Sequence, residues 1–111
     1  MSDRSTTIPL SDRVYDLLRC IPRGRVVTYG ELARAARCKS PRAIGQILRR
    51  NPYAPQVPCH RVIRSDLRLG GYSGSSTGSL LERKVQLLQS EGVYFAAGRL
   101  QDPEQLWSFP R

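Results

Sequence analysis

The sequence predicts one mainly α-helical domain with a small β part, containing a helix-turn-helix. Three observations support this prediction: a length of 111 residues, a hydrophobic share of 40%, and a succession of segments with helical apolar spacing or helix-capping residues. A chain of this length forms one compact domain, and its hydrophobic share excludes global disorder. We expect residues 1–10 to be a flexible N-terminus and residues 11–111 to form the domain.

Ser11, a residue type favoured at the N-cap, is predicted to cap the first helix. Its apolar residues recur with the 3.6-residue period of a helix: Val14, Leu17, Leu18 and Ile21. Cys20 lies within this pattern and is expected in the core. Pro22 and Gly24 end the helix, and the β-prone stretch 25–27 follows.

Two short helices joined by a tight turn are predicted next. Thr28 and Glu31 form a capping box that opens the first of them. Ser40 caps the second, with Pro41 at its favoured first position, and the helix runs from Arg42 to about Arg50. Asn51-Pro52 ends it, and its apolar residues are Ile44, Ile47 and Leu48. The pair is a helix-turn-helix candidate.

The second of these helices has the features of a DNA-contacting helix. It presents Arg42, Arg49 and Arg50 outward, and its small residues Ala43 and Gly45 let a backbone come close to DNA. The alternative reading is an ordinary solvated basic helix face.

Residues 52–79 are mostly irregular, with a short strand predicted at Val62–Ile63, and an irregular stretch of this length usually serves a function. Ser79 and Glu82 form a second capping box for a helix to about Ser90. The apolar face of that helix comprises Leu80, Leu81, Val85, Leu87 and Leu88. The C-terminal tail predicts a short strand pair around residues 94–96, with Trp107 and Phe109 packed on the core.

The charge of the chain favours a polyanionic partner. Eighteen basic residues, sixteen of them arginine, face nine acidic ones, for a net charge of +9. Arginine matches the geometry of phosphate oxygens, so a basic domain this small indicates nucleic acid rather than a merely solvated surface. No apolar run approaches the ~20 residues that cross a membrane, and the N-terminus lacks the apolar region of a secretory signal. We expect a protein that is not secreted, in the cytoplasm or nucleoid, or in a eukaryotic nucleus.

The cysteines argue against a disulfide framework and against zinc. Cys20, Cys38 and Cys59 are widely spaced, and the chain has a single histidine. These numbers complete neither a set of disulfides nor a usual zinc site, so we expect no metal, no cofactor and a reducing interior.

The most informative string is residues 57–62, Val-Pro-Cys-His-Arg-Val, which places Cys59 beside the only histidine, His60. A thiol is a poor nucleophile until it loses its proton, and a neighbouring imidazole or cation lowers its pKa. Pro58 restricts the backbone just before Cys59. Cys59 is therefore a candidate nucleophile, and the alternative is a neighbour pair with only a structural role.

Five strings, taken together and in this order, carry a family resemblance: Thr28-Tyr29-Gly30, Arg42-Ala43-Ile44-Gly45, Asn51-Pro52, Pro58-Cys59-His60-Arg61-Val62 and Gly71-Tyr72-Ser73-Gly74. They resemble the C-terminal domain of the methylated-DNA–protein-cysteine methyltransferases, the 6-O-alkylguanine-DNA alkyltransferase family, over roughly residues 11–95. The resemblance implies a winged-helix-like domain that binds the minor groove of double-stranded DNA. It also implies a DNA repair enzyme that flips out 6-O-alkylguanine and moves the alkyl group irreversibly onto Cys59, once per molecule.

The resemblance also assigns roles by matched position. His60 acts as a base through a water, Glu91 orients it, and Asn51 braces the turn that shapes the site. Tyr29 helps to turn the nucleotide out and contacts the base, and Arg42 fills the gap left in the stack. The Tyr72 side chain and the Ser73 backbone line the pocket near the departing oxygen. The other residues expected to bind DNA are Thr28, Ala43, Gly45, Arg49, Arg50 and Arg61.

The chain departs from the family pattern in three respects. Full-length members usually carry an extra N-terminal domain, the loop 74–79 is longer here, and Gly71 replaces a frequent Asn. The length and the Leu106-Trp107 tail resemble the alkyltransferase-like proteins, which lack the reactive Cys. Those relatives bind alkylated guanine without transfer and flag it for nucleotide-excision repair.

Three hypotheses follow. Because Cys59 is present, the first is a single-turnover alkyltransferase acting on alkylated duplex DNA. The second is a lesion-sensing DNA-binding protein that recruits nucleotide-excision repair proteins. The third is a helix-turn-helix regulator without chemistry. In each case we expect a monomer.

Overall fold

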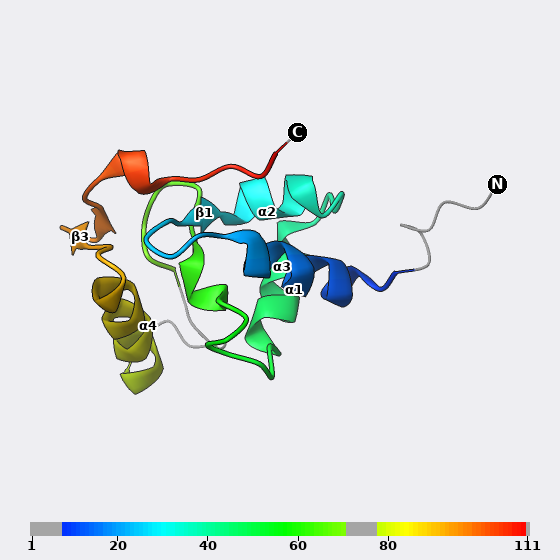
Figure 1. The fold of residues 1–111 in the computed structure, drawn as a ribbon, viewed down its shortest axis with the longest axis horizontal. Helices are drawn as coiled ribbons and strands as arrows, with labels where there is room; N and C mark the ends of the chain where they lie inside the picture. Colours follow the sequence, from blue (N-terminus) through cyan, green and yellow to red (C-terminus); the bar gives the residue numbers. More distant parts are fainter. Residues whose placement is uncertain (1–7, 71–77, 111) are drawn as a thin grey trace.

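The computed structural model describes residues 8–70 and 78–110. Figure 1 shows α1, α2 and α3 grouped on one side of the molecule, and α4 with β3 on the other. The mainly helical fold with a small β part is confirmed. The elements in chain order are α1 (Leu10–Cys20), β1 (Val27–Thr28), α2 (Tyr29–Ala35), α3 (Pro41–Arg49), the 3-10 turn η2 (Cys59–Arg61), β2 (Val62–Ile63), α4 (Ser79–Ser90), β3 (Phe95–Ala96), β4 (Arg99–Leu100) and the 3-10 turn η3 (Pro103–Gln105).

The helix-turn-helix is formed by α2 and α3, which pack against each other. The Thr28 hydroxyl accepts a hydrogen bond from the Glu31 N–H at 3.1 Å and caps α2. The Ser40 hydroxyl accepts from the Ala43 N–H at 3.2 Å and caps α3, with proline at the first position as predicted. Because both caps are local, sequence spacing located both helices to within a residue.

Two small strand pairs complete the fold. β1 pairs in parallel with β2, with Val27 opposite Val62 and Thr28 opposite Ile63. β3 and β4 form an antiparallel hairpin with Phe95 opposite Leu100, which is the small wing that the winged-helix prediction required. The strand predicted at residues 25–27 begins at Val27 and continues to Thr28.

Two predicted helix caps were wrong: the cap of α1 is Pro9, two residues before Ser11, and the cap of α4 is Gly78, one residue before Ser79. α1 begins at Leu10, directly after Pro9, so Ser11 lies inside its first turn. α4 begins at Ser79 with Gly78 at the N-cap, at a φ of 81° that glycine adopts without strain. Only the second of these caps needs a glycine, because Pro9 has an ordinary proline backbone conformation, with a φ of −54° and a ψ of 144°.

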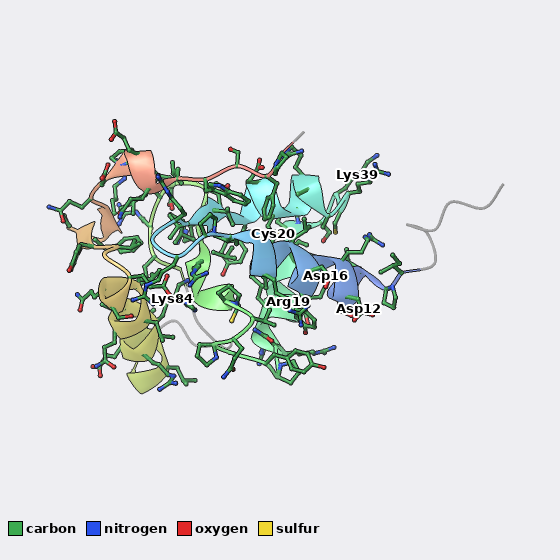
Figure 2. The ribbon with its side chains drawn as sticks, in the orientation of Figure 1. Asp12, Asp16, Arg19, Cys20, Lys39 and Lys84 are labelled. Atoms are coloured by element: carbon green, nitrogen blue, oxygen red, sulfur yellow. The ribbon has the colours of Figure 1, made fainter. Side chains whose placement is uncertain are left out.

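Cys20 is exposed, so its predicted place in the core was wrong. The buried residues of α1 are Val14 and Leu18. Two residues beyond Leu18, the helix has turned by about 200° and points away from the core. Figure 2 shows Cys20, Asp16 and Arg19 along α1.

The core consists of two hydrophobic clusters. The larger joins α1, α2 and α3 to Cys59, Val62 and Phe109. The smaller contains Val26, Ile63, Leu88, Val93 and Leu100. The two clusters adjoin at β2, because Val62 belongs to the larger and Ile63 to the smaller, and Cys59 belongs to the larger. Phe109 is 4% exposed and contacts Trp107 edge-on at 4.9 Å between ring centroids, which confirms the packing of the tail.

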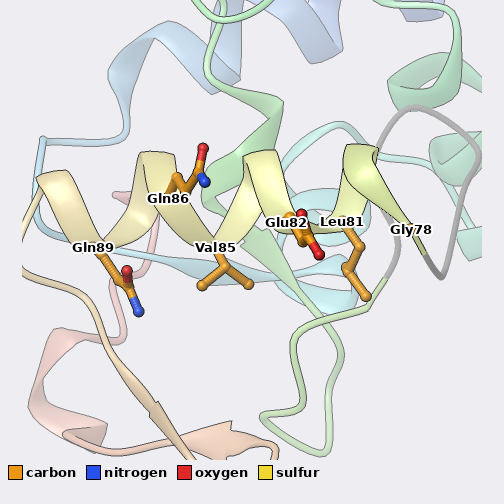
Figure 3. A pocket seen from close by; sticks show the side chains of 6 residues that line it. All are labelled: Gly78, Leu81, Glu82, Val85, Gln86 and Gln89. Carbon is orange, nitrogen blue, oxygen red and sulfur yellow. The ribbon is translucent and has the colours of Figure 1, made fainter.

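An open hollow of about 570 Å³ runs along α4 (Figure 3). Its lining comes from Gly78 and from one side of α4: Leu81, Glu82, Val85, Gln86 and Gln89. None of these is a predicted site residue. Among the described helices, none is long and apolar enough to cross a membrane.

Candidate functional site

Cys59 is held at the start of η2 by a braced loop. Its side chain is buried, with the residue 5% exposed, and its N–H donates to the Val57 carbonyl at 2.8 Å. The Asn51 Nδ2 donates to the same carbonyl at 2.9 Å, and the Asn51 Oδ1 accepts from the Tyr53 N–H at 2.9 Å. Asn51 therefore ties the two ends of the loop together, in the position that the predicted bracing role requires.

His60 and Arg61 both contact Glu91, the residue that follows α4. The His60 Nε2 lies 2.9 Å from the Glu91 Oε2. The Arg61 Nε donates to Oε1 at 2.8 Å, and its Nη2 donates to Oε2 at 2.9 Å, which makes a bidentate pair. The His60 and Glu91 side chains are only 2% and 5% exposed. The predicted partnership of His60 with Glu91 is thus present as a direct contact.

These contacts decide the protonation of the cluster. Burial by itself raises the pKa of Glu91, but hydrogen bonds from Arg61 and His60 lower it to about 2. Burial lowers the pKa of His60 against the opposing effect of Glu91. His60 is therefore neutral at pH 7 and donates its Nε2–H to the carboxylate.

The other ring nitrogen of His60 is then the basic one. Nδ1 is buried and has no hydrogen-bond partner among the residues described. In the neutral tautomer that donates through Nε2, Nδ1 carries the lone pair. It can accept a proton from a neighbouring donor or through a water.

Arg61 was predicted to bind DNA, and the structure places it elsewhere. Its guanidinium is bound to Glu91 and donates from Nη1 to the Ile21 carbonyl at 2.8 Å, with 15% of the side chain exposed. A carboxylate as buried as Glu91 requires a counter-charge, because an unpaired charge in the interior is costly. Arg61 supplies it and so holds the His60 partner in place.

Lys84 is a buried residue near Cys59 that the sequence prediction did not include. It is fully buried on α4, and its Nζ donates to the Val62 carbonyl at 2.8 Å and to the Leu69 carbonyl at 2.7 Å. Figure 2 shows it between α4 and the segment that carries β2. Burial lowers its pKa to about 7, although the charge of Cys59 acts in the opposite direction. The signal was present: Lys84 lies three residues after Leu81 and four before Leu88, in the middle of the apolar face.

Burial of Lys84 predicts a pH-dependent stability. Unfolded, Lys84 has its ordinary pKa of 10.5, and folded it has a pKa of about 7. Between these values the unfolded chain binds more protons, so the free energy of unfolding rises as the pH rises from about 7 to about 10. We expect Lys84→Met to remove that rise, which amounts to on the order of 4 kcal/mol.

Urea unfolding at a series of pH values measures this effect. Lys39, the other lysine of the chain, is exposed (Figure 2), so Lys39→Met is the matched control and should keep the pH dependence of the original protein. Equal pH dependence in Lys84→Met and the original protein would contradict the prediction.

An open hollow of about 590 Å³ brings together the predicted Tyr29 and Arg42, while Cys59, His60, Lys84 and Glu91 are not part of its lining. Burial, and then the charge of Cys59, raises the pKa of Tyr29. The rest of the lining is Pro41, Arg64, Ser65 and Asp66. The sequence reasoning missed the last three, although Arg-Ser-Asp directly after a short strand is a recognisable turn sequence.

The remaining candidates lie on or near α3. Arg42, Arg49 and Arg50 are exposed, and Ala43 is half-buried. A Cβ added at Gly45 would meet nothing within 4 Å, so the fold itself leaves room there for a partner from outside. Thr28 is occupied as the cap of α2. Tyr72 and Ser73, with Gly71, lie outside the residues that the structure describes. Within the described residues, no three His, Cys, Asp or Glu side chains gather into a set that could hold a metal ion.

Comparison with protein families identifies the domain. Residues 9–93 match the model of the 6-O-methylguanine DNA methyltransferase, DNA-binding domain family. The chain belongs to this family. Its match covers α1 to α4 and contains Cys59, His60, Lys84 and Glu91, so the buried cluster lies entirely inside the family domain.

Individual relatives agree with this assignment. A methylated-DNA–protein-cysteine methyltransferase of Thermococcus sibiricus is 48% identical over 88 residues, which are 78% of this chain and 46% of that protein. The crystal structure of an O6-methylguanine-DNA methyltransferase from Pyrococcus kodakaraensis superposes with a TM-score of 0.66 at 45% identity, over 78% of this chain and 47% of that one. The chain spans about half the length of the curated relatives it matches.

A third relative matches over almost its full length. The crystal structure of S. pombe Atl1 in complex with damaged DNA containing O6-carboxymethylguanine has a TM-score of 0.72 at 30% identity. The match covers 97% of this chain and 99% of that one.

Proposed function

We propose that this chain repairs DNA by binding the duplex through the minor groove, flipping out 6-O-alkylguanine and transferring the alkyl group to the Cys59 sulfur. It acts as a methylated-DNA–protein-cysteine S-methyltransferase that is consumed by a single turnover. The observation that carries this proposal is the buried thiol of Cys59 directly before His60, whose Nε2 contacts the Glu91 carboxylate at 2.9 Å.

The residues support a nucleophilic displacement. The His60 Nδ1 takes the thiol proton through a water, while Glu91 fixes the tautomer that leaves this nitrogen free to do so. The sulfur then forms a bond to the alkyl carbon as the bond from that carbon to the guanine oxygen breaks. The electron pair leaves with the oxygen, which a proton or a hydrogen-bond donor stabilises. The resulting thioether is stable, so the sulfur is not regenerated.

Lys84 adds a second group that responds to the charge of Cys59. Its amine is buried, and the charge of Cys59 favours the protonated form of this lysine. By linkage, an ammonium at Lys84 favours the thiolate at Cys59. We assign Lys84 a positioning role, because it also ties β2 to the segment at Leu69 through two carbonyls.

The hollow between Tyr29 and Arg42 is the proposed entrance for an extruded base. An alkyl group on a paired guanine cannot be reached inside the stack, and extrusion costs a few kcal/mol. Tyr29 and Arg42 line the hollow from α2 and α3. Arg42 would fill the gap in the stack, and the small Ala43 and Gly45 would let α3 approach the backbone. Tyr72 and Ser73 would complete the pocket around the leaving oxygen.

The proposed partner is double-stranded DNA that contains 6-O-alkylguanine, bound by a monomer in the cytoplasm or nucleoid, or in the nucleus of a eukaryote. The net charge of +9 supports sequence-independent contacts to phosphates. Such binding suits a protein that must search DNA for rare lesions.

Intact mass after mixing with a duplex bearing one 6-O-methylguanine tests the proposed function. We expect a gain of one methyl group, mapped to Cys59 by peptide analysis. Binding of the lesion with no gain in mass would overturn transfer and leave a lesion sensor. Equal affinity for unrelated duplexes would argue against a sequence-specific regulator.

A further inference from the structure

A tight turn after β2 brings two arginines together. The Arg64 N–H donates to the Arg68 carbonyl at 2.9 Å, and the Leu67 N–H donates to the Arg64 carbonyl at 2.9 Å. Leu67 has a φ of 68°, the left-handed conformation that closes the turn. Arg64 and Arg68 therefore stand at the two ends of a closed loop, on the same short stretch of backbone. We call Arg64, Asp66 and Arg68 the arginine turn.

Asp66 lies between the two guanidinium groups. Its Oδ2 is 3.1 Å from the Arg64 Nη2 and 3.7 Å from the Arg68 Nε, while its Oδ1 accepts from the Arg68 N–H at 3.1 Å. The three side chains are exposed, at 59%, 44% and 55% in chain order. One carboxylate thus serves two cations, and the turn keeps a net positive charge.

A phosphate can replace or supplement Asp66 as the partner of these two arginines. Exposed ion pairs contribute little to stability, because water and salt screen them. A guanidinium has five N–H donors in a planar fork, so each arginine can hold Asp66 and still offer donors to a second anion. A phosphate matches that fork with two of its oxygens.

The turn is anchored to the rest of the fold. The Leu100 N–H donates to the Leu67 carbonyl at 2.8 Å, and Arg68 pairs with Arg99 in an isolated β-bridge, which ties the turn to the wing strand β4. On the other side, a Cβ built on Gly70 would lie 3.2 Å from the Arg64 Cγ and 3.6 Å from the Tyr29 ring. Arg64 and Tyr29 therefore pack around the same glycine.

The turn also contributes to the lining of the hollow described above, through Arg64 and Asp66 but not through Arg68. Tyr29, Pro41 and Arg42 line it from α2 and α3, while Arg64, Ser65 and Asp66 line it from the turn. A nucleotide that enters between these walls carries backbone phosphates on both of its sides. Arg42 stands on one wall, and the arginine turn supplies positive charge on the other.

We propose that the arginine turn binds a backbone phosphate of the strand that carries the extruded nucleotide, on the side of the hollow opposite Arg42. This inference rests on the proposed function, because it takes the hollow as the entrance for a flipped base. Arg64 and Arg68 bind the phosphate, and Asp66 holds both side chains in position in the free protein. The contact reads no base, so it acts on damaged and undamaged duplexes alike.

A salt titration of DNA binding tests the proposal. The double variant Arg64→Gln/Arg68→Gln is compared with the original protein on one duplex with, and one without, a 6-O-methylguanine. Each lost phosphate contact reduces the slope of log K against log salt concentration by about 0.9. We expect a reduction of about 1 to 2 for the double variant, on both duplexes equally.

Arg19→Gln is the matched control. Arg19 is 50% exposed and also pairs with a neighbouring carboxylate, Asp16, but it lies on α1 and not on the hollow. Its loss removes a charge without removing the proposed contact. The proposal would be overturned if the double variant reduced the salt slope by no more than twice the reduction seen in Arg19→Gln. It would also be overturned if the original protein bound neither duplex.

Asp66→Asn gives a second test with the opposite sign. The Asn Oδ1 can still accept from the Arg68 N–H, so the turn is retained. Both guanidiniums lose their charged competitor, and we expect binding to tighten several-fold at low salt. Weaker or unchanged binding would contradict the proposal. Binding to the undamaged duplex requires no chemistry at Cys59, so failure of methyl transfer and failure of this contact are observed separately.

Discussion

Cys59→Ser is expected to abolish methyl transfer while the protein still binds duplex DNA that contains 6-O-methylguanine. A serine hydroxyl at this position stays protonated at pH 7 and is a far weaker nucleophile than a thiolate. The change removes little volume, and the residue is 5% exposed, so packing in the larger cluster is retained. Intact mass after incubation with the lesion duplex measures transfer, and fluorescence anisotropy of a labelled duplex measures binding.

Cys20→Ser provides the control for this experiment. Cys20 is exposed on α1, outside the cluster of Cys59, His60 and Glu91, and we expect full transfer in that variant. A gain of one methyl group in Cys59→Ser would show that another group accepts the alkyl. Loss of DNA binding together with transfer would show that the serine variant is misfolded, which circular dichroism would reveal independently.

Glu91→Gln is expected to have the second largest effect, on stability and on transfer together. The carboxylate accepts from His60 and twice from Arg61, and the amide that replaces it carries no charge. Removing one partner of a buried ion pair costs about 3–5 kcal/mol, because the remaining charge is left unpaired. The tautomer of His60 also loses its fixed acceptor, so we expect transfer to slow by about 10²–10⁴-fold, the usual contribution of general acid–base catalysis.

The same substitution changes the response to acid. The folded pKa of Glu91 is about 2, against an ordinary value of 4.5. A carboxyl with a lowered pKa stabilises the fold above its ordinary value and loses this contribution as the pH falls. We therefore expect the original protein to lose stability between about pH 4.5 and pH 2 through this group, and Glu91→Gln to lack that part of the loss.

Glu82→Gln serves as the matched control for both effects. Glu82 is an exposed residue of α4, the same helix that ends directly before Glu91. Its unfolding free energy, acid response and rate of methyl transfer should match those of the original protein. Normal transfer in Glu91→Gln would exclude Glu91 from the orientation of His60.

Local features of the sequence were enough for the helical framework and for half of the site. The caps at Thr28 and Ser40 operate within three residues of the chain, so spacing alone located α2 and α3. The string around Cys59 and His60 is contiguous, and its chemistry depends on residue type. The core position predicted for Cys20 was wrong, because the buried face of a helix is narrower than the run of apolar residues from which that position was inferred.

Contacts between distant segments decided the rest. Glu91 lies 31 positions after His60, and only the family resemblance, not the local sequence, paired the two residues. Arg61 was assigned to DNA because the local sequence does not show that the Glu91 carboxylate is buried and binds its guanidinium. Lys84 is a site residue only because α4 packs its Nζ against the carbonyls of Val62 and Leu69. The arginine turn shares a hollow with Tyr29 because β1 pairs in parallel with β2 and brings the residues after each strand to one edge. Residue types determine which chemistry a chain can perform, whereas burial and long-range pairing determine which of those residues share a site, because charge, desolvation and hydrogen bonding act through space and not along the sequence.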